Sequence, residues 1–149
     1  MSRIDTGITG HLFEEEVLGV LFVSWSCEDY ISFDQALAQA KASQNWDPRD
    51  PSSRLANDLH AEVALALGLN DWRELRLYSS VGTPLDHFHG VDGFFEFCGR
   101  VVTIDLTVGH KEFAKADFVL HPLDLEEHRQ TTASAIARAL MRERRRVAC

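Results

Sequence analysis

The chain has 149 residues, a mass of 16.8 kDa and a formal net charge of −8, with 45% hydrophobic and 26% charged residues. This composition indicates one globular domain, 1–149, and excludes a disordered chain. The helices and strands expected along the chain give it the α/β class. The acidic balance argues against nucleic-acid binding by bulk electrostatics alone, although an enzyme that uses a metal ion on phosphates gains local positive charge from the ion.

Three features of the sequence bear on where the protein works. No apolar run approaches the roughly 18 to 20 residues needed to cross a bilayer. The N-terminus lacks the basic start and the small-residue cleavage site of a signal peptide. The cysteines, Cys27, Cys98 and Cys149, form no C-x-x-C pair, and their odd number argues against a disulfide framework. We therefore expect a cytoplasmic protein without a membrane partner.

The N-terminal third, residues 1–50, is predicted as a helical extension. Its apolar segment 17–23 is compatible with a strand or with part of a helix that begins near His11, and periodicity does not decide between them. Residues 32–35 have the form of a capping box ahead of an alanine-rich helix. The prolines within 46–53 then predict a loop.

The next predicted helix runs from about Arg54 to Leu67 and ends at Gly68, a common residue after a helix. One acidic residue, Glu62, lies at the edge of its apolar stripe instead of on the solvent side. A carboxylate there either reaches out to water or points to the sheet that the helix covers, where it needs a cation or a donor. The second alternative makes Glu62 a candidate site residue.

Segments 91–97 and 100–108 are rich in β-branched and aromatic residues and alternate at the strand period, which predicts a β-hairpin. A two-residue turn over 98–99 sets Asp92 directly opposite Asp105. A three-residue turn with a bulge is the alternative, because Cys-Gly is not a preferred pair for the tight turn. That alternative would move one aspartate to the core face, where an unpaired carboxylate is costly.

The two-residue turn gives the hairpin one apolar face and one face that carries both aspartates. The apolar face holds Val91, Phe95, Phe97, Val102, Ile104, Leu106 and Val108. On the other face, the directly opposed residues have Cβ atoms roughly 4.5 to 5.5 Å apart, so two carboxylates repel each other unless a cation lies between them. A hard divalent cation such as Mg²⁺ or Mn²⁺ is the natural candidate.

The other elements are predicted from composition and from turn residues. They are a helical turn over 71–74, a strand over 75–80, a loop over 82–90, a turn or short helix over 109–115, a strand over 116–121, and a C-terminal helix over about 124–146.

The order from Glu62 onward is a helix with a glutamate, a strand, a strand with Asp92, a strand with Asp105, a short connection and a strand. This order resembles the PD-(D/E)xK nuclease superfamily, whose restriction-endonuclease-like core is a helix, three strands, a helix and a further strand. The resemblance covers about 54–121. It implies a metal-dependent nuclease that hydrolyses phosphodiesters, with DNA as its nucleic-acid partner. Asp92, Asp105 and Glu62 would be both catalytic residues and ligands of Mg²⁺ or Mn²⁺.

One position departs from the family pattern. Thr107 stands two residues after Asp105, where the family has the lysine that assists the attacking water. The family is known for relocating this lysine, so Lys111, or else Lys115, is expected to take the catalytic role. If neither lysine reaches the site, the chain is a catalytically inactive member of the fold that binds nucleic acid or protein, or serves a structural role. A homodimer is compatible with both the active and the inactive alternative.

The histidines invite a zinc interpretation, above all His87 and His89 with Cys98 or His110 nearby. Neither H-E-x-x-H nor C-x-x-C occurs, so the sequence disfavours zinc. His87 and His89 are expected at the rim of the acidic site or in a loop without a role there. Asp86 is either an extra carboxylate of the site or a turn residue.

Overall fold

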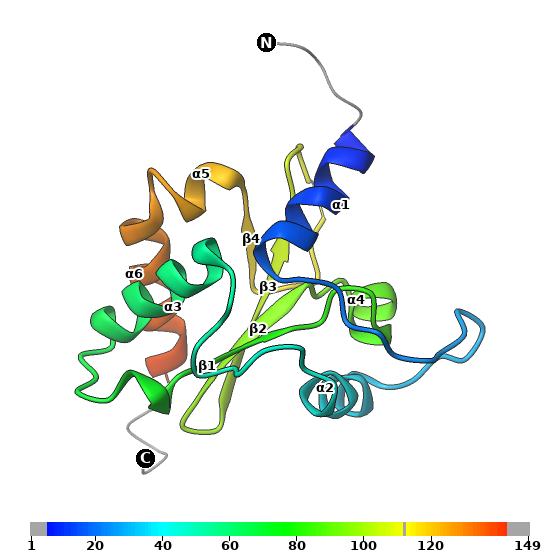
Figure 1. The fold of residues 1–149 in the computed structure, drawn as a ribbon, viewed down its shortest axis with the longest axis horizontal. Coiled ribbons are helices and arrows are strands. Elements are labelled where there is room, and N and C mark those ends of the chain that lie inside the picture. Colours follow the sequence, from blue (N-terminus) through cyan, green and yellow to red (C-terminus); the bar gives the residue numbers. More distant parts are fainter. Residues whose placement is uncertain (1–5, 112, 143–149) are drawn as a thin grey trace.

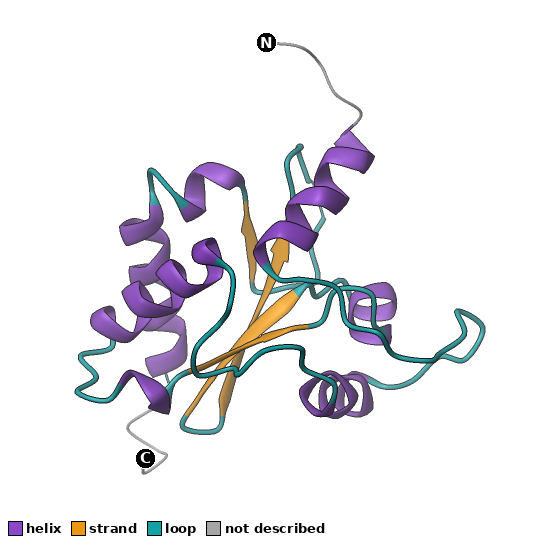
Figure 2. Ribbon diagram, viewed as in Figure 1, coloured by secondary structure: helices purple, strands orange, loops and turns teal. Residues whose placement is uncertain are grey.

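The computed structural model describes residues 6–111 and 113–142. A four-stranded mixed sheet lies between helices on both faces (Figure 1, Figure 2). The strands are β1 (Arg76–Ser79), β2 (Gly93–Phe97), β3 (Arg100–Leu106) and β4 (Phe118–Leu120). The helices of the described part are α1 (Thr6–Val17), α2 (Phe33–Ala42), α3 (Arg54–Ala66), α4 (Pro84–His89), α5 (Pro122–Leu125) and α6 (Arg129–Met141), with a short 3₁₀ helix, η1 (Trp72–Glu74). The predicted α/β class is confirmed.

The strands follow one another in sequence order across the sheet, β1-β2-β3-β4. β2 is antiparallel to both β1 and β3, and β4 runs parallel to β3. A parallel return needs a connection that crosses from one end of the sheet to the other. Here that connection is the segment 107–117, in which the described residues form no helix. None of the described helices has the length and apolar content to cross a membrane.

The β2–β3 hairpin has the predicted register. Phe95 pairs with Val102, and the turn over 98–99 has two residues. Their φ angles are 53° and 77°, which a type I′ turn requires at both central positions. The alternative turn with a bulge is thereby excluded. Gly93 pairs with Ile104, so Asp92 comes next along the chain opposite Asp105, and the Asp92 amide donates to the Ile104 carbonyl (2.9 Å).

The sheet has a buried core on each face. On one face, α3 and α6 cover the sheet with residues that include Leu59 and Ile136, which pack with Phe95, Phe97, Val102, Ile104 and Leu106. On the other face, α2 and α4 cover Phe94 and Tyr78 (Figure 1). The prediction that Val91 belongs to the first core was wrong. Val91 precedes β2, its amide donates to Leu85 in α4, and its side chain packs in the second core.

The N-terminal segment is part of the core and not only an extension of it. α1 begins earlier than expected, and Phe13, Val17 and Leu18 are buried in the core that α3 and α6 share. The helix ends at Val17, Gly19 follows with a φ of 75°, and residues 20–31 form neither helix nor strand. The apolar segment 17–23 is therefore a helix end followed by an irregular chain.

Local signals in the sequence account for α2 and α4. The predicted capping box is present, because the Gln35 amide donates to the Ser32 hydroxyl and the Ser32 amide donates to the Gln35 side chain, both at 3.2 Å. The loop predicted over 82–90 was wrong, since it contains α4. Pro84 stands in the first turn of this helix, where proline is common, and Gly90, with a φ of 68°, ends the helix.

The C-terminal part consists of two helices instead of one. Pro122 starts α5, and the chain turns at 126–128 before α6 begins. The buried face of α6 includes Ala133, Ile136 and Leu140, as its periodicity predicts. The end of the predicted helix, up to residue 146, lies outside the described residues.

Candidate metal centre

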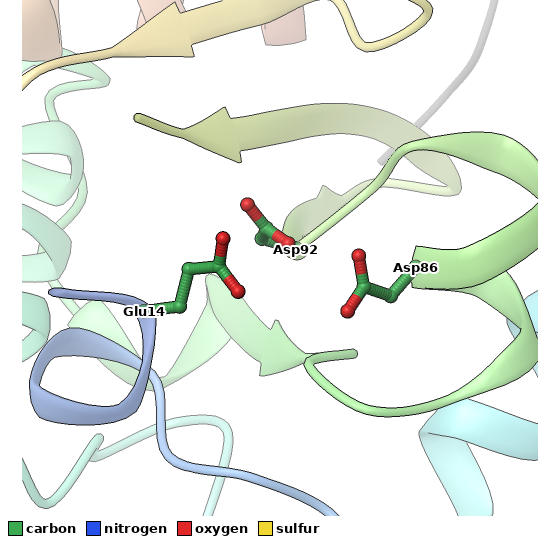
Figure 3. A group of neighbouring side chains, drawn as sticks. All are labelled: Glu14, Asp86 and Asp92. Carbon is green, nitrogen blue, oxygen red and sulfur yellow. The ribbon is translucent and has the colours of Figure 1, made fainter. Parts of the chain in front are cut away.

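Four carboxylates from four parts of the chain meet beside the sheet. Glu14 lies near the end of α1, Asp86 lies in α4, Asp92 immediately precedes β2, and Asp105 lies in β3. Glu14, Asp86 and Asp92 each offer a carboxylate oxygen within 4.8 Å of the other two (Figure 3). Asp105 joins them because its carboxyl is close enough to raise the pKa of Asp92. We call these four residues the carboxylate group.

Two aspartates of the group are held by backbone amides. Asp92 is 1% exposed, and its Oδ2 accepts a hydrogen bond from the Leu106 amide (2.7 Å). Asp86 Oδ2 accepts from the Gly82 amide (3.0 Å), which fixes the carboxylate at the start of α4. These two hydrogen bonds hold the Asp86 and Asp92 carboxylates in place, and both donors are uncharged backbone amides.

Burial and mutual repulsion disfavour the ionised forms of this group. Burial is the largest cause that raises the pKa of Asp92 above its ordinary value, and the carboxyls of Asp105, Asp86 and Glu14 raise it further, against the Leu106 amide. Burial also raises the pKa of Asp86, opposed first by the Gly82 amide. The pKa of Glu14 rises to about 7, first through burial and then through Asp86. A cation among these oxygens would remove the repulsion.

One lysine reaches the carboxylate group. Lys111 Nζ lies 2.5 Å from Asp105 Oδ2, and the side chains are 38% and 7% exposed. The hydrogen bond to Asp105 raises the pKa of Lys111, so its ammonium stays charged at neutral pH. Thr107 and Gly109 make the turn that brings Lys111 back, because the Gly109 amide donates to the Thr107 hydroxyl (3.3 Å). Lys115 points elsewhere and donates to the Phe88 carbonyl (3.1 Å).

Glu62 is not a member of the carboxylate group. It lies half-buried on α3, a helix that covers one face of the sheet. The glutamate that a helix does bring to the group is Glu14 on α1. Sequence analysis missed Glu14 because it left the structure of 17–23 undecided, so the faces of α1 could not be assigned. The sequence did contain a signal for Glu14, because it lies between Phe13 and Val17, which are both apolar and both buried.

The histidines considered for zinc, His87, His89 and His110, are not members of the grouped ligands. His89 Nε2 is 3.0 Å from the Ile31 carbonyl oxygen, and the His87 ring lies against Trp25 with centroids 5.1 Å apart. His110 is exposed. The grouping of potential ligands in the described residues thus contains carboxylates and neither histidine nor cysteine.

The chemistry of these donors fits a hard divalent cation. Carboxylate oxygens suit Mg²⁺ and Mn²⁺, whereas zinc sites use thiolate and imidazole ligands as a rule. The second part of the fit is the raised pKa of Glu14, Asp86 and Asp92, because burial and repulsion disfavour their ionised forms and a cation would compensate both effects. Glu14, Asp86, Asp92 and Asp105 are the residues that could hold such an ion.

Comparison with known proteins adds no family assignment. No protein-family model matches the chain, and neither curated proteins nor solved structures give a significant match.

Proposed function

We propose that this protein is a metal-dependent phosphodiester hydrolase of nuclease type that acts on DNA, with a restriction-endonuclease-like core. The observation that carries the proposal is the ion pair between Lys111 and Asp105 beside Asp92. An acid immediately before β2 and an acid on β3, with a lysine beside the second acid, correspond to the set that the sequence resemblance implies. The sheet order β1-β2-β3-β4, with β4 parallel to β3, supports such a core, whereas the described residues of 107–117 form no helix where the resemblance implies one.

In this proposal Glu14, Asp86, Asp92 and Asp105 would hold the ion, and Asp105 also pairs with Lys111. Glu14 takes the place that the sequence assigned to Glu62. Bound Mg²⁺ or Mn²⁺ would polarise the scissile phosphate and lower the pKa of a coordinated water. The protein side chains supply position and charge around that phosphate.

Lys111 acts as a fixed cation in this scheme. Its pKa is raised by Asp105, so it keeps its proton and is unsuited to be a general base. An ammonium held near the scissile phosphate stabilises the negative charge that develops there during attack by water. Thr107 offers no charge for this purpose. A lysine that reaches Asp105 also removes the reason for expecting a catalytically inactive member of the fold.

Plasmid nicking tests the proposal. Supercoiled plasmid is incubated with the protein and Mn²⁺, and a parallel sample contains EDTA. We expect relaxed and linear products with Mn²⁺ and none with EDTA. Asp92→Asn and Lys111→Ala should abolish cleavage, while Lys115→Ala, the matched lysine that points away, should keep it. An absence of cleavage on plasmid, duplex and single-stranded DNA with either Mg²⁺ or Mn²⁺ would refute the assignment.

A further inference from the structure

A pocket apart from the carboxylate group lies between α3, η1 and the loop that precedes α3. Its volume of about 350 Å³ falls within the roughly 300 to 1,000 Å³ of small-molecule sites. No residue of the carboxylate group lines it, and α3 covers the sheet face opposite to the one that α4 covers. We call it the α3 pocket. Its polar lining is Asp50, Asn57 and His60, and its apolar lining includes Ala64, Leu65 and Trp72.

His60 is the buried polar group of the α3 pocket, with 3% of its surface exposed. Its Nε2 lies 2.7 Å from the carbonyl oxygen of Leu75. A carbonyl oxygen only accepts hydrogen bonds, so Nε2 carries the proton. Burial is the largest cause that lowers the pKa of His60, so the ring is neutral and Nδ1 is unprotonated. Nδ1 has no hydrogen-bond partner among the described residues, which leaves it as an acceptor for a ligand.

Asn57 and Asp50 add further acceptors to the pocket. The Asn57 amide nitrogen donates to Asp50 Oδ1 (2.9 Å) and to the Pro51 carbonyl oxygen (2.8 Å). Both partners are acceptors, so the amide orientation is fixed and both of its hydrogens are used. Asn57 Oδ1 and Asp50 Oδ2 remain as acceptors. Asp50 forms no ion pair with a lysine or arginine of the described chain, so a cation in the pocket would have an unpaired carboxylate to bind.

The apolar lining is open to solvent. Trp72 is 47% exposed and Leu65 is 73% exposed. The Trp72 ring stands edge-on to His60, with centroids 6.2 Å apart and planes at 83°. The face of an indole ring attracts cations, and apolar walls around a few placed polar groups are typical of small-molecule sites. Within this described lining, the Trp72 indole N–H is the one side-chain donor that no hydrogen bond already uses.

We propose that the α3 pocket binds a small amine in its ammonium form that carries an apolar group. Three side chains offer acceptors, one of them a carboxylate, so a ligand must bring N–H donors and gains from positive charge. The apolar part of the ligand would lie against Leu65 and Trp72. An anion would meet the Asp50 carboxylate and unpaired acceptors. This inference goes beyond the proposed function and does not depend on it, because the two sites share no residue.

Two-dimensional ¹H–¹⁵N NMR on the full chain in EDTA tests the inference, because each signal also reports where the ligand binds. The probe is 2-phenylethylamine, with 2-phenylethanol and 3-phenylpropionate as neutral and anionic analogues of similar size. We expect the amine to shift the amide signals of Ala64 and Leu65 and the indole N–H signal of Trp72. It should bind at least about tenfold more tightly than the alcohol, since hydrogen bonds to charged groups are the stronger ones. The anion should not bind.

Two variants separate charge from the aromatic contact. Asp50→Asn keeps an acceptor for Asn57 and removes the charge, so it should weaken amine binding by about two- to fivefold. Trp72→Leu keeps an apolar contact and removes the ring, with an expected loss of about two- to fivefold. Asp34→Asn is the matched control, because Asp34 is an exposed acid on α2 and lies outside the pocket; its affinity should equal that of the wild type.

Four outcomes would overturn the inference. They are the absence of shifts at the pocket signals in millimolar amine, equal binding of the alcohol or the anion, unchanged affinity in Asp50→Asn, and shifts confined to the carboxylate group. Plasmid cleavage bears on the proposed function alone. Failure of the amine to bind therefore removes this inference and leaves the proposed function, and a lack of cleavage does the reverse.

Discussion

Replacing Asp92 by asparagine separates a metal centre from a set of structural hydrogen bonds. The side chain is buried, and an asparagine oxygen can still accept from the Leu106 amide. The change therefore keeps the shape and the main hydrogen bond while it removes one acid from the carboxylate group. If Asp92 is there to bind a cation, the variant should become more stable without metal and should lose its response to metal.

The geometry sets the size of both effects. Carboxylate oxygens of Glu14, Asp86 and Asp92 lie within 4.8 Å of one another. Two full charges at that separation repel by about 3 to 4 kcal/mol at an effective dielectric constant of about 20. Proton uptake relieves much of this repulsion, so we expect Asp92→Asn to be more stable by about 1 to 2 kcal/mol above neutral pH, a rise in Tm of about 2 to 8 °C.

Metal should act in the opposite sense on the wild type. An ion at about 100 times its Kd stabilises the folded state by about 2.7 kcal/mol, which raises Tm by about 5 to 11 °C. Differential scanning fluorimetry with Mg²⁺, Mn²⁺ or EDTA measures both effects. Asp117→Asn is the control, because Asp117 accepts from the Thr103 amide (2.9 Å) and lies outside the carboxylate group. A variant at Asp92 that is less stable than wild type, or that keeps the metal response, would refute the reasoning.

Three further predictions follow from the same geometry. Lys111→Ala should lower the cleavage rate by at least about 100-fold with little change in metal affinity, because it removes charge stabilisation of the transition state; equal losses in Lys115→Ala would contradict this. The pKa of Glu14 is raised to about 7, so its folded form gains protons relative to the unfolded chain. Its contribution to stability is therefore complete below about pH 4.5 and is lost as the pH rises through about 7. Calorimetry should accordingly show metal affinity that increases over this range with release of protons, and a pH-independent affinity would argue against Glu14 as a ligand. Gly93→Ala should lower stability by about 1 to 3 kcal/mol in urea unfolding, since the new Cβ would lie 2.8 Å from the Tyr78 carbonyl oxygen and 2.9 Å from Leu18 Cδ1; an unchanged midpoint would show that β1 and Leu18 yield.

The hairpin could be predicted because its information is local. The strand period fixes which residues share a face, and the number of turn residues fixes the partners. Both constraints gave the pairing of Phe95 with Val102, and hence Asp92 opposite Asp105. The turn at Gly109 likewise made it plausible that Lys111 returns to Asp105. These inferences needed no knowledge of how distant elements pack.

Glu14 and Asp86 could not be assigned in the same way. Glu14 joins the carboxylate group only because α1 packs against the core with Phe13 and Val17, a long-range contact that no local pattern specifies. Asp86 was left between two interpretations because α4 is short, although Pro84 and Gly90 marked its ends. Glu62 was a candidate because it lies at the edge of an apolar stripe, but the carboxylates that the described residues bring together include Glu14 and not Glu62.

The most direct test of the metal centre is anomalous diffraction from crystals grown with Mn²⁺. The account predicts a manganese peak in contact with Asp92 and with at least two of Glu14, Asp86 and Asp105, and no such peak in crystals of Asp92→Asn. A wild-type structure at saturating Mn²⁺ in which these carboxylates contact one another with no ion among them would contradict the account.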